Sequence, residues 1–94
     1  MIVYNKFYKE KKMRANKCGD RIRIARAMHA PPLSQEDLAA MMQVRSFNLS
    51  NNAISRIESG KRYVTDLELI EFSKILNVST AWLLEETDDT RKRY

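Results

Sequence analysis

The chain has 94 residues, which is enough for one domain, and its single cysteine, Cys18, cannot form an internal disulfide. It carries 17 Lys and Arg against 12 Asp and Glu, a net charge of +5 that is compatible with a nucleic-acid partner. No stretch approaches the ~18 apolar residues of a membrane span. The start of the chain lacks the apolar core of a signal peptide, so we expect a cytoplasmic protein.

The positive charge is concentrated at one end of the chain. Residues 1–17 hold six Lys and Arg against one Glu, whereas residues 18–84 hold eight against seven. We expect residues 1–17 to form a flexible basic arm, residues 18–86 the folded domain, and residues 87–94 a polar tail. The arm is interpreted either as a solvated segment or as one that reaches DNA phosphates or a groove.

The first predicted helix spans about residues 19–29. It ends before the Pro31-Pro32 pair, because proline disfavours helix in the residue before it. Its buried stripe consists of apolar residues at helical spacing: Ile22, Ala25 and Met28, or Ile24 and Met28.

Four further helices are predicted to begin after a Ser or Thr that can cap the first turn: Ser34, Ser50, Thr65 and Ser79. Each cap lies between two apolar residues at the offset of a hydrophobic staple. These pairs are Leu33 and Leu38, Leu49 and Ile54, Val64 and Leu69, and Val78 and Leu83. Asp37 and Glu68 also stand at the capping-box position of two of the helices. The pattern predicts an all-α fold of five compact helices.

The third predicted helix, within residues 50–60, has two contrasting faces. Ile54 and Ile57 can face a core, and Gly60 can provide the left-handed residue that ends the helix. The other side consists of four polar residues: Asn51, Asn52, Ser55 and Arg56. All four can hydrogen-bond to base edges, with Asn suited to adenine and Arg to guanine. We therefore predict that this helix reads DNA.

Residues 19–86 resemble the phage-repressor and Cro-like (XRE) helix-turn-helix family. The stretches that carry the resemblance are Arg21-Ile-Arg-Ile-Ala-Arg26, Leu33-Ser-Gln-Glu-Asp-Leu-Ala39, Ile54-Ser-Arg-Ile-Glu-Ser-Gly-Lys61, Leu76-Asn-Val-Ser79 and Trp82-Leu-Leu84. The resemblance implies a compact five-helix, lambda-repressor-like domain. Its second and third helices form the motif, and the third lies in the major groove.

The resemblance also implies roles for single residues. The base-facing positions match Asn51, Asn52, Ser55 and Arg56, and the phosphate-contacting positions match Gln35, Ser50, Lys61 and Arg62. Arg26 and Glu58 match a structural ion pair between the first and third helices. The implied function is a DNA-binding transcriptional regulator, a repressor of the prophage or stress-response kind, acting as a homodimer on a palindromic operator. The alternatives are an antitoxin, which binds a toxin protein and regulates its own expression through DNA binding, and an interaction module that has lost DNA binding.

The segment between the second and third helices departs from the family pattern. Seven residues, 43–49, separate Met42 from the Ser50 cap, where about three are usual, and the usual Gly is absent. Either the second helix runs through Val44, or the turn is an enlarged loop with Phe47 and Leu49 folded inward.

No residue pattern in the chain indicates catalysis, a cofactor or a metal site. His29 has no ligand cluster near it, and Cys18 has no partner. Trp82 is expected to be mostly buried.

Overall fold

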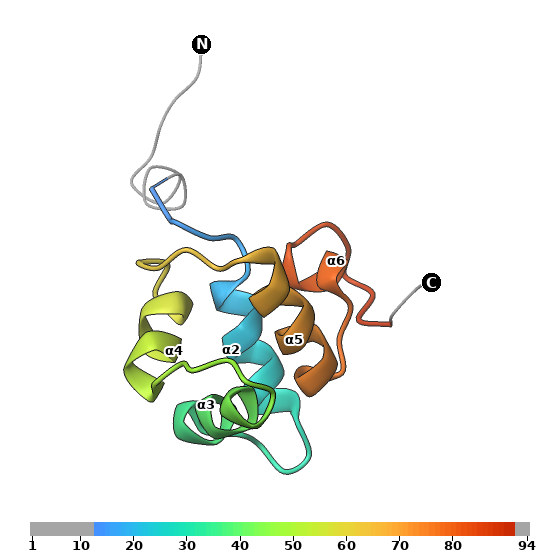
Figure 1. Cartoon of the computed structure of the whole chain (residues 1–94). Coiled ribbons are helices and arrows are strands. Elements are labelled where there is room, and N and C mark those ends of the chain that lie inside the picture. Colours follow the sequence, from blue (N-terminus) through green and yellow to red (C-terminus); the bar gives the residue numbers. More distant parts are fainter. Residues whose placement is uncertain (1–12, 92–94) are drawn as a thin grey trace.

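The computed structural model describes residues 13–91, and it confirms the all-α fold (Figure 1). The helices of this part of the chain are α2 (Gly19–Met28), α3 (Gln35–Val44), α4 (Asn51–Glu58), α5 (Asp66–Leu76) and α6 (Thr80–Leu83). Residues 1–12 of the predicted arm (residues 1–17) and residues 92–94 of the predicted tail (residues 87–94) fall outside the described residues.

The four predicted caps are present at the starts of α3, α4, α5 and α6. The hydroxyls of Ser34, Ser50, Thr65 and Ser79 each accept a hydrogen bond from the backbone N–H three residues further on. The capping boxes of α3 and α5 are complete, since the Asp37 and Glu68 carboxylates also accept from the N–H of their cap residue. The helix starts predicted from the staples are therefore confirmed.

A single core joins all five helices. Its largest fully buried side chains are those of Ile22, Leu38, Met42, Ile54, Ile57, Phe72 and Leu83. Trp82 is 6% exposed, as expected, and the Arg21 guanidinium lies over its ring, 4.7 Å from the centroid. Burial of apolar surface of this kind is the main stabilising contribution in a domain without disulfides.

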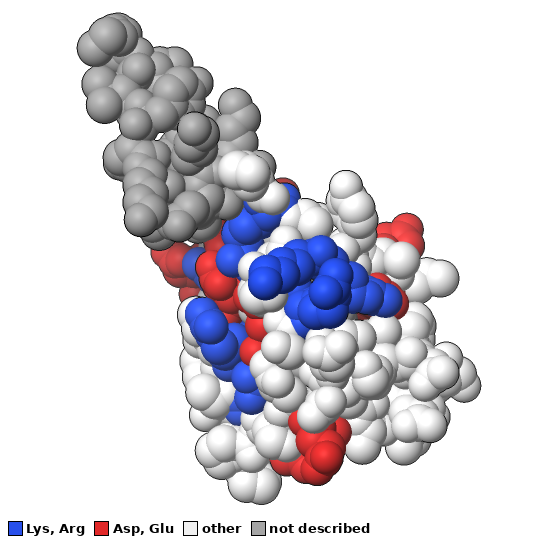
Figure 2. Space-filling model, turned by 90° about the vertical axis from the view of Figure 1, so that its left-hand side faces the viewer, with Lys and Arg blue, Asp and Glu red and all other residues white. Residues whose placement is uncertain are grey.

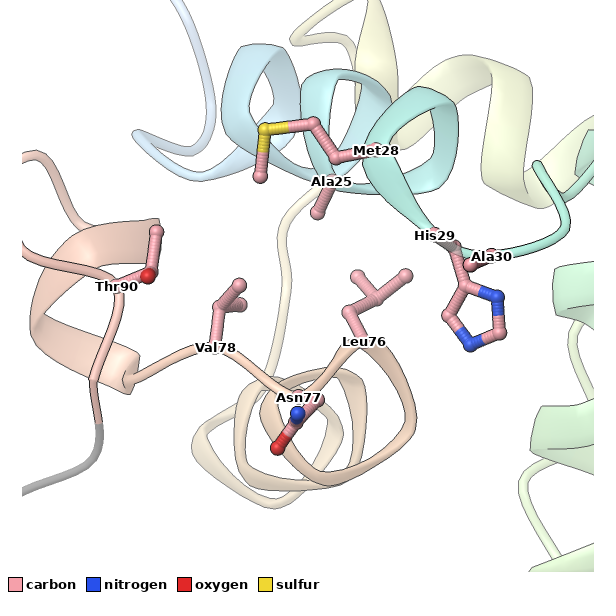
Figure 3. Close-up of a pocket in the computed structure, with 8 residues that line it drawn as sticks. All are labelled: Ala25, Met28, His29, Ala30, Leu76, Asn77, Val78 and Thr90. Carbon is pink, nitrogen blue, oxygen red and sulfur yellow. The ribbon is translucent and has the colours of Figure 1, made fainter.

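The predicted stripe of α2 is wrong at its end. Ile22 and Ala25 are buried, but Met28 is 56% exposed and Ile24 is 46% exposed. Met28 lies in the last turn of α2, at the edge of a hollow of about 360 Å³ (Figure 3). The residues at the junction of α5 and α6, with Thr90, form the other side of this hollow. No element packs onto Met28, so helical spacing alone did not bury it.

The segment before α4 combines both of the alternatives left open by the sequence. Helix α3 does run through Val44, which is 86% exposed, and the chain then turns with Leu49 buried and Phe47 partly buried. The Ser46 N–H donates to the Gln43 carbonyl, and the Phe47 N–H donates to the Met42 carbonyl. This is a Schellman ending, in which Ser46 takes the left-handed conformation (φ 71°) that glycine normally supplies.

Replacing Ser46 with glycine is expected to raise the free energy of unfolding by up to about 1 kcal/mol. Glycine removes the left-handed strain, although it also makes the unfolded chain more flexible. Replacing Ser46 with valine should lower stability instead, because β-branched residues tolerate positive φ poorly. Urea denaturation of both variants tests this, and the same sign of effect in both would contradict it.

Candidate nucleic-acid interface

Helix α4 has one buried and one exposed face, as the sequence predicts. Ile54 and Ile57 have no exposed surface. The opposite side carries the four base-facing candidates, all of them exposed: Asn51, Asn52, Ser55 and Arg56. Within residues 13–91, none of these four side chains makes a hydrogen bond or ion pair, so their polar groups are open to a partner.

Helices α2 and α3 support α4 from the inner side. In Figure 1, α4 lies at the left of the molecule with α2 behind its buried face and α3 below. Figure 2 shows this left-hand side from the front, where Lys and Arg side chains gather beside a broad uncharged area, with Asp and Glu side chains between and below them. Because residues 18–84 are almost neutral overall, this concentration of positive charge results from placement of the side chains.

The buried carboxylate of Glu58, which is 4% exposed, joins α4 to α2 and α3. Its two oxygens accept from Arg26 Nε at 2.6 Å and Nη2 at 2.8 Å, so the ion pair implied by the family resemblance is present. Gln35 Nε2 donates to the same carboxylate at 3.1 Å, and Arg26 Nη1 donates to the Leu33 carbonyl. The hydrogen bonds with Glu58 raise the pKa of Arg26. This network links three helices through one charged group.

Gln35 and Ser50 therefore have internal roles besides the predicted phosphate contacts. Gln35 uses one amide hydrogen on Glu58 and has a second one to donate. The exposed Ser50 hydroxyl accepts from the Ala53 N–H, and its own hydrogen is still available. Both residues lie at helix N-termini, where backbone N–H groups also favour an anion.

Lys61 and Arg62, the other two phosphate candidates, differ in their surroundings. Lys61 is exposed and makes no ion pair within the described part of the chain. Arg62 instead donates to both oxygens of Glu68, at 3.1 and 3.2 Å, and to the Tyr63 carbonyl. Burial alone would raise the pKa of Glu68, but the hydrogen bonds from Arg62 and the Thr65 backbone hold it below its usual value. Arg62 thus has a structural partner that the sequence did not suggest.

Two residues that contact α4 were missed because they lie in the predicted arm. Arg14 Nη2 donates to the Glu58 carbonyl at 3.1 Å, and Asn16 Nδ2 donates to the Ile57 carbonyl at 3.0 Å. The folded contacts therefore begin before residue 18, the predicted start of the domain. One signal was available, since Asn is a favoured helix cap and Asn16 stands three residues before Gly19.

A metal site, a reactive thiol and a membrane span each have their own structural requirements. The described residues contain no group of three or more His, Cys, Asp or Glu that could hold a metal ion. Burial raises the pKa of the Cys18 thiol to about 11, so it is protonated at neutral pH and a poor nucleophile. No helix in residues 13–91 is both long enough and apolar enough to cross a membrane.

A short capped helix that rests on its predecessor and exposes a polar face defines a helix-turn-helix DNA-binding domain. A family model described as helix-turn-helix matches residues 33–83, which include α3 to α6. The chain belongs to the XRE/Cro-like helix-turn-helix family, a family of DNA-binding transcription regulators. Neither the curated proteins nor the solved structures gave a match.

Replacing Glu58 with alanine is expected to lower the free energy of unfolding by about 3 kcal/mol, because the mostly buried charge of Arg26 then has no carboxylate partner and keeps only the Leu33 carbonyl. Replacing Glu71 with alanine is the matched control. The two cations that pair with Glu71, Arg45 and Lys74, are 44% and 55% exposed, so water can solvate both of them and the expected loss is below about 1 kcal/mol. Chemical denaturation measures both losses of free energy of unfolding. Equal losses would show that the Glu58 network stabilises the fold no more than the ion pairs of Glu71 do.

Proposed function

We propose that this protein is a sequence-specific transcriptional regulator, a repressor, that reads the major groove with α4. One observation carries the proposal. Four adjacent side chains suited to base edges are exposed on α4 with no internal partner among the described residues, while the other face of the same helix is fully buried. A polar face of this kind contributes nothing evident to the fold.

The proposed readout follows from the chemistry of these side chains. Asn51 and Asn52 can each bind adenine through its N6 and N7 groups, and Arg56 can bind guanine through O6 and N7. Ser55 can donate to or accept from either base. These contacts would determine which DNA sequence the protein binds.

The proposed phosphate contacts would fix the position of the helix without selecting sequence. Gln35 and Ser50 would contribute at the starts of α3 and α4, and Lys61 would contribute just after α4. Arg62 would add to them by exchanging Glu68 for a phosphate. Because the folded part of the chain has almost no net charge, its affinity for DNA would depend on these few phosphate-contacting groups.

We further propose that the regulator is a homodimer. Two copies related by a two-fold axis would place two α4 helices in successive major grooves, about 34 Å apart along the DNA. Selection of bound DNA from a random pool tests this proposal directly. A palindromic motif with half-sites about 10 base pairs apart supports it. Recovery of no motif overturns it and favours an interaction module that has lost DNA binding, whereas a small protein that co-purifies with the chain favours the antitoxin alternative.

Replacing Arg56 or Asn52 with alanine should reduce the preference for the selected motif by about 1–3 kcal/mol for each bidentate base contact removed. The measurement is the affinity for the motif relative to a scrambled duplex. Lys74 to alanine is the control for loss of one positive charge, because Lys74 is exposed on α5, on the other side of α2 from α4 (Figure 1). Equal weakening on both duplexes would argue against base readout by the altered residue.

Removing residues 1–12, which contain four lysines and one glutamate, should flatten the dependence of DNA affinity on salt concentration. The slope of log affinity against log salt falls by about 0.9 for each phosphate that is no longer neutralised. Removing residues 92–94, which deletes Lys92 and Arg93, is the comparison. If the slope is the same with and without residues 1–12, these residues do not contact phosphates.

A further inference from the structure

We infer that Arg14 and Asn16 are positioning residues for DNA recognition, because they clamp the C-terminal end of α4 onto the start of α2. We call these two residues the N-terminal clamp. The inference rests on the proposed function of α4 as the reading helix. It adds that the orientation of α4 toward DNA depends on the segment that contains Arg14 and Asn16, which precedes the first helix of the described residues.

Asn16 bridges three parts of the fold with one side chain. Its Nδ2 donates to the Ile57 carbonyl at 3.0 Å and to the Arg62 carbonyl at 2.8 Å. Its Oδ1 accepts from the Gly19 N–H at 2.8 Å, which satisfies a free donor at the start of α2. The two amide hydrogens and the carbonyl oxygen therefore join the start of α2, the last turn of α4 and the segment that follows α4.

Arg14 holds the same end of α4 through charge and packing. Its Nη2 donates to the Glu58 carbonyl at 3.1 Å, and its Nη1 forms an ion pair with Asp20 of α2 at 3.4 Å. The guanidinium packs against Gly60, where a Cβ atom would lie 2.8 Å from Arg14 Cζ. The neighbouring Ala15 N–H donates to the Gly60 carbonyl at 2.8 Å. Every one of these contacts is at the end of α4 or at the start of α2.

Such a clamp is possible because the backbone groups at the two ends of a helix lack hydrogen-bond partners within that helix. At the C-terminal end these groups are the last carbonyls. Here the Glu58 carbonyl accepts from Arg14. The Ile57 carbonyl accepts from Asn16 in addition to the Gly60 N–H. The carboxylate of Glu58 is held independently by Arg26 and Gln35 on the inner side. The last turn of α4 is thus fixed by its backbone through the clamp and by its side chain through the buried network.

The orientation of α4 matters for base recognition because the helix is short. Helix α4 has eight residues, so it is about 12 Å long, and a small tilt of its C-terminal end moves Arg56 further from its base than it moves Asn52. Bidentate base contacts need both hydrogen bonds at once, so small misplacements break them. The apolar core, which Arg14 and Asn16 do not join, holds α4 in place, and the clamp fixes its direction.

The test compares clamp variants with a matched tether elsewhere in the fold. The clamp variants are Arg14→Ala and Asn16→Ser. The serine can still cap α2, but it has no amide to donate to α4. The control is Arg21→Ala. Arg21 also tethers the start of α2 to backbone carbonyls, those of Trp82 and Thr87 at 2.9 and 2.7 Å, but these belong to α6 and the segment after it and not to α4.

The readout is the ratio of affinities for the motif selected by the wild-type chain and for a scrambled duplex of equal length, at one salt concentration and below each melting temperature. Both clamp variants should reduce this ratio by roughly tenfold, the size of one weakened bidentate interaction. Arg21→Ala should lower the melting temperature and leave the ratio unchanged. Arg14→Lys, which can still donate to the Glu58 carbonyl, should recover part of the ratio.

The possible failures are distinguishable. If the wild-type chain selects no motif, the proposed function fails. If it selects a motif and the folded clamp variants keep the wild-type ratio, the clamp is only structural and the inference is overturned. A drop of the ratio in Arg21→Ala equal to that in the clamp variants also overturns it, because general destabilisation would then explain the effect. If Asn16→Ser does not fold, the affinity ratios of Arg14→Ala and Arg14→Lys test the inference.

Discussion

The carboxylate of Glu58 is buried where α2, α3 and α4 meet, and burying a charged group is costly unless other groups pair with it and donate hydrogen bonds to it. Arg26 supplies two hydrogen bonds from α2, and Gln35 supplies a third from α3. Because a buried ion pair costs hydration, its net stabilisation of the fold is small. What it fixes is the mutual orientation of three helices, and the direction in which the polar face of α4 points depends on that orientation.

The exposed side of α4, unlike the buried network of Glu58, carries polar side chains that have no partners within the described residues. Its asparagines, serine and arginine are exposed and make no internal hydrogen bonds within the described residues, while Ile54 and Ile57 anchor the other side. A helix of two turns is marginal by itself, so its stability comes from its cap and its neighbours. The Schellman ending at Ser46 sets the path into the Ser50 cap, and this ending replaces the shorter turn that is usual in the family.

Much of the candidate site could be predicted from the sequence. The faces of α4 follow from a 3.6-residue period, and the Arg26–Glu58 pair followed from matching the motif residue by residue. Arg62 and Gln35 show the limit of such matching. Both match phosphate-contacting positions, yet Arg62 is paired with Glu68 and Gln35 donates to Glu58. A sequence shows which donors exist, but the competition between acceptors depends on which of them are near.

The sequence by itself determined the helix starts, the staple pairs and the two faces of α4, because caps and periodicity act between residues three to five apart. Only the tertiary structure decided that Met28 is exposed, that Ser46 takes the place of a glycine, and that Arg14 and Asn16 hold the end of α4. The hydrogen bonds of Arg14 and Asn16 with α4 join residues 44 and 41 positions apart. Contacts at that separation depend on how whole helices pack, and no local pattern in the chain specifies them.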